Sequence, residues 1–266
     1  MRLLSLNKLF YIFIFISFSA AQIDYTISHE LKYGDGKELL NGQYVPYNYF
    51  ENLLDINLSY SRFNLYEQWE YSDPPQFGYP LQKLNKAYLE YIDDELMVKL
   101  GDIYTLYGRG LGLNLFQDQS LDFDNSLRGV EFSYSHDDGF KLFGLGGRGL
   151  FEYKSSPSSR YNDKSIDHSV TAFGAEIWLP WISSNVIMFN INQDIESLSV
   201  GGDIENKHID NDNFGLNGIW GPVDFYLEKS WLDWNTEGEY DELNNPIHHK
   251  GGFLYTALSF DLFGFG

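Results

Sequence analysis

The sequence predicts an all-β protein, and more closely an antiparallel transmembrane β-barrel with about twelve strands in this chain. Three observations lead to this fold class. Apolar and polar residues alternate along many short segments, long and short connections follow one another in turn, and aromatic residues fall near the expected strand ends. The 20 Tyr and 21 Phe of the chain agree with it, because strands favour aromatic side chains.

The strands are predicted from a period of two. In residues 53–60, for example, apolar side chains alternate with polar ones: Leu54, Ile56 and Leu58 against Asp55, Asn57 and Ser59. Such alternation is typical of a strand with one apolar and one polar face. The expected strands cover residues 23–33, 53–60, 63–71, 84–92, 95–107, 128–135, 140–148, 168–178, 185–193, 213–220, 223–232 and 251–262.

The connections predict how the barrel is oriented. Short turns at 93–94, 136–139, 179–184 and 221–222 alternate with long polar connections, which cover residues 34–52, 72–83, 108–127, 149–167, 194–212 and 233–250. Outer-membrane barrels have short periplasmic turns, long external loops and an even number of strands. Aromatic residues near the strand ends would lie at the two membrane–water boundaries: Tyr60, Tyr71, Trp178, Trp181, Trp220 and Trp231.

The first 21 residues predict a secretory signal peptide. Arg2 and Lys8 give a positive start, Leu9 to Phe18 an apolar centre, and Ser19-Ala20-Ala21 a cleavage site before Gln22. The apolar centre is too short for a membrane-spanning helix, which needs roughly 20 residues. We therefore expect export to the outer membrane, with the barrel formed by residues 22–266.

The last residues, Phe263-Gly264-Phe265-Gly266, leave two interpretations open. Phe265 could serve as the terminal aromatic signal that the barrel-assembly machinery reads. Alternatively, this chain is C-terminally incomplete and forms part of a larger barrel.

Charge and composition exclude several functions. The net charge of −20 argues against nucleic acid as a partner, because binding phosphates requires a basic surface. The absence of cysteine excludes disulfides and thiolate chemistry. No cofactor is expected, since the GxGxxG pattern of 144–149 precedes no helix. No metal site is expected either, because His248 and His249 would point to opposite faces of a strand.

The connection at residues 108–127 is the best candidate for a functional site. Gly108, Gly110 and Gly112 permit sharp turns, so this segment could fold into the barrel. Its charges could then form a pore constriction that selects polar solutes or ions, with two arginines facing three aspartates: Arg109, Arg128, Asp118, Asp122 and Asp124. The alternative is an outward loop whose charges are simply solvated.

Residues 84–134 also carry a recognisable pattern. It comprises Gly101-Asp102-Ile103-Tyr104, Tyr107-Gly108-Arg109-Gly110-Leu111, Asp124-Asn125 and Arg128-Gly129-Val130. This segment resembles a family of uncharacterised Gram-negative outer-membrane β-barrel proteins, described as porin-like or of unknown function. The resemblance implies an outer-membrane barrel without an established activity. It also implies longer members, which favours the larger-barrel interpretation.

The sequence thus predicts a porin-like barrel for passive passage of small polar or cationic solutes, and no enzyme. Outer-membrane lipid, surface polysaccharide, the barrel-assembly machinery and small polar solutes are the expected partners. Two alternatives remain: a secreted all-β carbohydrate-binding module, or a barrel with an assembly or enzymatic role. The alternation of loop lengths favours a barrel over a module. On the last strand we further expect the side chains to alternate between two sides. Leu258, Phe260 and Leu262 should point toward lipid, and Ser259 and Asp261 should point inward.

Overall fold

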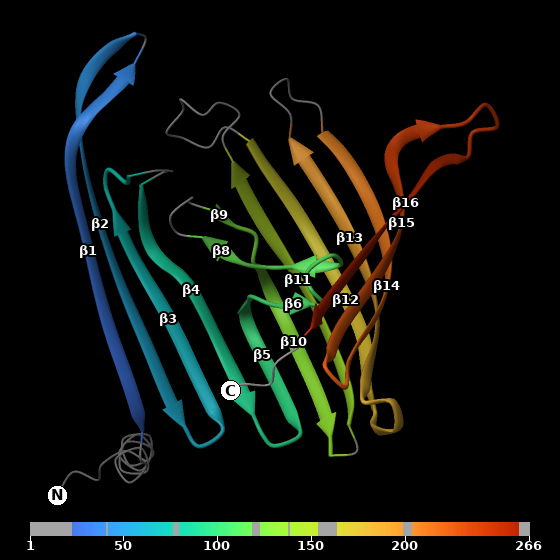
Figure 1. Ribbon diagram of the computed structural model, residues 1–266. Helices are drawn as coiled ribbons and strands as arrows, with labels where there is room; N and C mark the ends of the chain where they lie inside the picture. The colour runs from blue at the N-terminus through green and yellow to red at the C-terminus, as the bar shows by residue number, and fades with distance from the viewer. Residues whose placement is uncertain are drawn as a thin grey trace, which may run out of the picture.

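The computed structural model describes residues 23–40, 42–76, 80–118, 123–137, 139–153, 164–198 and 204–260. Twelve strands form one antiparallel sheet that follows the order of the chain (Figure 1). They are β1 (Asp24–Leu40), β2 (Gln43–Tyr60), β3 (Phe63–Ser72), β4 (Leu81–Ile92), β5 (Leu96–Ile103), β10 (Leu127–His136), β11 (Phe140–Tyr153), β12 (Lys164–Leu179), β13 (Ser184–Leu198), β14 (Ile204–Trp220), β15 (Val223–Tyr240) and β16 (Pro246–Phe260). The predicted all-β antiparallel class with about twelve strands is confirmed.

The sheet curves into a trough, and residues 104–118 and 123–126 lie on its concave side (Figure 1). β1 and β16 are the two edges of the strand order, and among the described residues they do not pair with each other. The sheet is therefore of barrel type but open. The predicted signal peptide and residues 261–266, with both interpretations of the chain end, lie outside the described residues. In the part of the chain that is described, no helix has the length and apolarity of a membrane span.

Short turns join the strands at the lower end of Figure 1, as predicted. β4 and β5 are joined through residues 93–95, and β14 and β15 through Gly221-Pro222. The connection of β12 to β13 contains η1 (Pro180–Ile182), a single 3-10 turn.

Four of the predicted long connections are wrong in extent, because the strands continue into them. β1 continues to Leu40 and β2 begins at Gln43, so these two strands occupy most of the loop predicted at 34–52. The connections at 149–167, 194–212 and 233–250 are shortened in the same way. These extensions escape a search for alternation, because polar residues follow one another there, as in residues 205–208. Backbone pairing between neighbouring strands does not require an apolar face.

The two faces of the sheet differ because successive side chains point to opposite sides. We call the concave face, which carries residues 104–118 and 123–126, the inner face, and the opposite one the outer face. On β12, Val170 and Ala172 are buried on the inner face, whereas Phe173 is 57% exposed on the outer face. On β16, Leu258 pairs with Phe225 on the outer face and Ser259 with Asp224 on the inner face, as expected. Leu262 and Asp261 lie outside the described residues.

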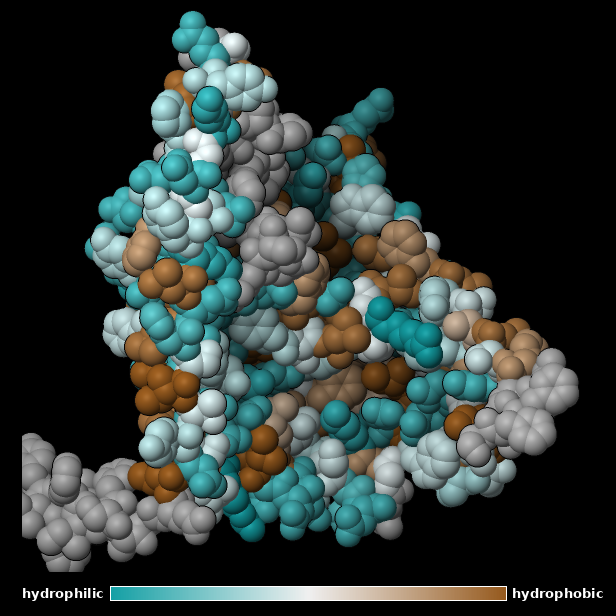
Figure 2. Space-filling model, turned by 60° about the vertical axis from the view of Figure 1, so that its left-hand side comes forward, coloured by the Kyte–Doolittle hydropathy of each residue, from teal (hydrophilic) through white to brown (hydrophobic). Residues whose placement is uncertain are grey.

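The outer face has an apolar band at its lower end. On β15 it runs from Val223 past Phe225 and Leu227 to Trp231, eight residue steps of about 3.3 Å or about 26 Å. Lys229 interrupts it, but its ammonium lies 5.6 Å from the centre of the Trp231 ring, toward the edge of the band. In Figure 2 hydrophobic side chains emerge along the flank of the molecule, and its upper end is mostly hydrophilic. Aromatic residues at the strand ends are exposed, including Tyr60, Tyr71, Trp181 and Trp220.

Candidate functional site

Residues 104–118 and 123–126, which we call the insert, leave the wall of the sheet after β5. The predicted strand at 95–107 ends earlier, at Ile103, and the chain forms two small hairpins instead. They are β6 (Leu106–Tyr107) with β7 (Leu113–Asn114), and β8 (Gln117–Asp118) with β9 (Phe123–Asp124). Gly108 and Gly110 have positive φ values of 65° and 87°, which glycine adopts without strain. The prediction that this segment can fold inward agrees with its position on the inner face.

Apolar side chains fix one side of the insert to β11, β12 and β13. The Tyr107 ring lies 4.5 Å from that of Phe143 and 5.9 Å from that of Phe189, centre to centre. Leu113 and Leu115 join the same buried cluster. A side chain at Gly112 would meet the Phe189 ring, so close packing requires glycine there. Burial raises the pKa of the Tyr107 hydroxyl, and the phenol therefore stays protonated.

A buried carboxylate holds the turn between β6 and β7. Glu228 on β15 is completely buried, and its Oε2 accepts hydrogen bonds from the backbone N–H of Arg109 at 2.9 Å and from the Tyr226 hydroxyl at 2.6 Å. The Arg109 guanidinium lies 4.3 Å from the centre of the Tyr226 ring, a cation–π contact. A Cβ at Gly108 would come within 2.5 Å of this carboxylate. The backbone of the insert is thus seated directly on Glu228.

The far end of the insert contacts β4 through Lys86. The Lys86 ammonium lies 3.5 Å from the Asp124 carboxylate, donates a hydrogen bond to Gln117, and lies 5.0 Å from the centre of the Tyr104 ring. The Tyr104 hydroxyl donates to Asp124 at 3.2 Å. Since Lys86 itself is only 4% exposed, its charge depends on these partners. The insert therefore bridges from β15 to β4 across the inner face.

The predicted constriction residues do not form one cluster. Arg109 lies against β15 and Asp124 against β4, while the backbone of Asp118 pairs with Phe123 in the β8–β9 hairpin. Asp122 lies outside the described residues.

Placing Arg128 in the constriction is wrong. It is on the outer face and pairs with Asp102 at 3.0 Å. The reason is strand alternation, since its neighbour Leu127 is completely buried on the inner face.

Sequence reasoning missed the residues that hold the insert: Lys86, Tyr226 and Glu228. All three come from strands distant from the insert in the sequence. A weak signal was present for Glu228, which is a charged residue at an inner position of β15 between buried Tyr226 and Ser230.

The inner face of β2, β3 and β4, which we call the polar wall, has a different character. Asp55 accepts hydrogen bonds from the Tyr66 hydroxyl at 2.7 Å and from the Gln68 amide at 2.8 Å. The Asn85 amide donates to Glu70 at 2.9 Å. Because Gln68 is opposite Lys86 in the register, this network lies on the same face as the insert.

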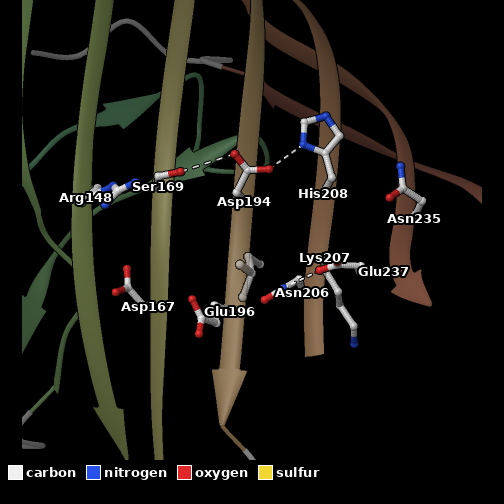
Figure 3. A pocket seen from close by; sticks show the side chains of 11 residues that line it. Arg148, Asp167, Ser169, Asp194, Glu196, Asn206, Lys207, His208, Asn235 and Glu237 are labelled. Carbon is white, nitrogen blue, oxygen red and sulfur yellow. Dashed lines mark hydrogen bonds and ion pairs between the residues drawn. The ribbon is translucent and has the colours of Figure 1, made fainter. Parts of the chain in front are cut away.

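A second polar region lies on the outer face, above the apolar band. The Ser169 hydroxyl, the Asp194 carboxylate and the His208 ring lie in a row across β12, β13 and β14 (Figure 3). They line a depression of about 420 Å³ together with Arg148. One oxygen of the Asp194 carboxylate accepts a hydrogen bond from the Ser169 hydroxyl at 3.5 Å. The other oxygen lies 2.7 Å from Nδ1 of the His208 ring. The serine therefore hydrogen-bonds the carboxylate, whereas a nucleophilic serine hydrogen-bonds its histidine base.

The chain is therefore an open antiparallel sheet of barrel type, with an apolar band on its outer face and the insert on its inner face. The chain belongs to a family described as being of unknown function, DUF6029, which matches residues 20–161, more than half of its length. A comparison with curated proteins finds no match. Among solved structures, the chain is similar to OmpT, an outer membrane protein of Vibrio cholerae, with a TM-score of 0.46 and 10% identity, over 91% of this chain and 83% of that one.

Proposed function

We propose that this chain forms an outer-membrane barrel wall through which small polar or cationic solutes pass by diffusion. The observation that carries the proposal is the contrast between the faces. An apolar band lies at the lower end of the outer face, and on β15 it extends about 26 Å along the strand. With the strand tilt of outer-membrane barrels, about 35–45°, this length corresponds to a height of about 20 Å, against the roughly 25 Å band of such barrels. The inner face combines the polar wall with an insert that narrows the space before it.

In lipid, the unpaired backbone groups of β1 and β16 need partners, because no water is present to bind them. We expect these edges to pair in the membrane, either with each other or with strands of a larger barrel. The cysteine-free chain offers a direct test, because cysteines introduced in β1 and β16 can form a disulfide only across such a closure. A monomeric crosslinked band supports pairing of the two edges within one chain.

Solutes would pass in front of β2 and β3, beside the end of the insert that Lys86 holds. The apolar side of the insert is packed against β11 to β13, so the proposed route lies on its other side. Asp55 and Glu70 on the polar wall would lower the energy of cations and raise that of anions. The expected passage is therefore weakly cation-selective.

Recording from the purified protein in a planar bilayer tests the proposal. We expect steady conductance with a cation preference at 0.1 M salt. This preference should weaken at 1 M, because the Debye length falls from about 10 Å to about 3 Å. If the protein inserts into the bilayer but gives no conductance, the proposed passage of solutes is contradicted and only the proposed membrane-embedded sheet remains.

A barrel with an enzymatic role is the second candidate function, and the row of Ser169, Asp194 and His208 is the observation that favours it. His208 held by Asp194 could act as a general base toward water. The test is a hydrolase screen with ester and peptide substrates, comparing the wild type with His208→Ala. Activity that is lost in His208→Ala would support this candidate.

A further inference from the structure

A chamber of about 370 Å³ lies beneath the insert, on the inner face. Residues 105–108 of the insert form part of its lining, and inner-face side chains of β10 to β15 form most of the rest. Its volume falls within the range of sites for small molecules. The polar wall contributes none of its lining residues, so this is a place apart from the route proposed above.

Charged side chains of both signs line the chamber on three neighbouring strands. They are Glu131 on β10, Lys141 on β11 and Glu176 on β12. The register places Lys141 opposite Glu176, yet the two charged groups form no ion pair within the described residues. Glu131 is only 5% exposed. The Thr105 side chain hydrogen-bonds Glu131, and Lys99 and Lys141 lie near enough to stabilise its charge.

Neutral polar groups complete the lining. The Asn185 and Asn217 side chains belong to it, and no hydrogen bond between described residues engages either of them. The Tyr107 hydroxyl is buried without a hydrogen-bond partner among the described residues, and Tyr107 also lines the chamber. Buried hydroxyls in folded proteins are almost always hydrogen-bonded. A polar solute bound in the chamber would supply the missing partner.

We infer that this chamber binds small zwitterions, molecules that carry both an ammonium and a carboxylate group. The solute carboxylate pairs with Lys141 and its ammonium with Glu176, the two chamber charges that the register places opposite each other. A simple anion would leave Glu176 without an ion pair, a simple cation would leave Lys141 without one, and a neutral sugar would leave both without one. The inference goes beyond the proposed function, because this binding site lies apart from the proposed route.

Saturation-transfer NMR on the full chain in detergent measures binding without any flux. The probes are glycine as zwitterion, ethylammonium as cation, acetate as anion and D-glucose as neutral solute. Two variants alter the chamber: Lys141→Met removes the ammonium and keeps the side-chain length, and Glu176→Gln removes one carboxylate charge. Lys37→Met on β1, outside the chamber lining, is the matched control.

We expect glycine to give the strongest signal and acetate and glucose little. Lys141→Met should weaken glycine about tenfold and should not weaken ethylammonium, because it removes a positive charge. Glu176→Gln should weaken both, and Lys37→Met neither. Equal signals from glycine and glucose, or glycine binding that neither chamber variant changes, would overturn the inference. Binding without conductance in the bilayer would retain the site and reject only the passage.

Discussion

The two halves of the inner face use the same strand geometry for different purposes. On β11 to β13 the inward residues include an apolar cluster, with Phe143, Val170 and Phe189, which the insert covers. On β2 to β4 they are mainly polar and bonded to one another, as Asp55 and Gln68 are. The first half therefore holds the insert in place, and the polar wall faces the proposed route. Alternation alone thus reveals a two-sided strand without telling which medium each side faces.

The strongest test of the comparison is removal of an anchor on the apolar half. Phe189→Ala opens a cavity under Tyr107 and should lower the free energy of unfolding by about 3–5 kcal/mol. Conductance should rise as the insert loosens. Unfolding in urea and bilayer recording measure the two effects. Phe173→Ala, at an exposed position of the outer face, is the control, and an equal loss there would contradict a packed insert.

The assignment of the two faces is tested on β16. Leu258→Arg places a charge in the outer band and should cost about 2–4 kcal/mol if the position is near the bilayer centre. Ser259→Arg, one residue on, should be tolerated because its side chain points inward. Folding into vesicles, followed by the heat-modifiable shift of barrels on gels, compares them. Similar losses in both variants would mean that the register of β16 is shifted.

The seat of the insert on Glu228 is tested at Gly108. Gly108→Ala adds a methyl group at a positive φ and within 2.5 Å of the Glu228 carboxylate. We expect a cost of about 1–2 kcal/mol and faster proteolysis of the insert. Gly146→Ala serves as the control, because an added Cβ there meets nothing within 4 Å. Identical proteolysis in both variants would place the turn elsewhere.

The smallest effect is expected on the polar wall. Asp55→Asn removes one carboxylate from the proposed route and should shift the reversal potential in a salt gradient slightly toward anions. Asp194→Asn on the upper outer face should leave it unchanged. A shift in the control alone would place the route outside the trough.

Much of the fold could be predicted, because a strand with one apolar face shows an alternation of apolar and polar residues, as in residues 53–60. The upper strand extensions could not, since residues such as Glu205 to His208 are polar on both faces. The glycines of the insert indicated that it could turn inward. The contacts of the insert with Lys86 and Glu228 could not be predicted from the sequence, because they depend on how the whole sheet curves. The prediction for Arg128 was wrong because adjacent side chains of a strand point to opposite faces, and it is the neighbouring Leu127 that points inward.

The central claim, that solutes pass along the polar wall beside an insert seated on the apolar half, can be tested with single cysteines in this cysteine-free chain. Asn57→Cys lies on the polar wall at an exposed position, and Ala172→Cys lies on the apolar half and is 3% exposed. A charged, membrane-impermeant thiol reagent is added during bilayer recording. The account predicts that current falls in Asn57→Cys and stays constant in Ala172→Cys. Current that falls in Ala172→Cys and not in Asn57→Cys would contradict it.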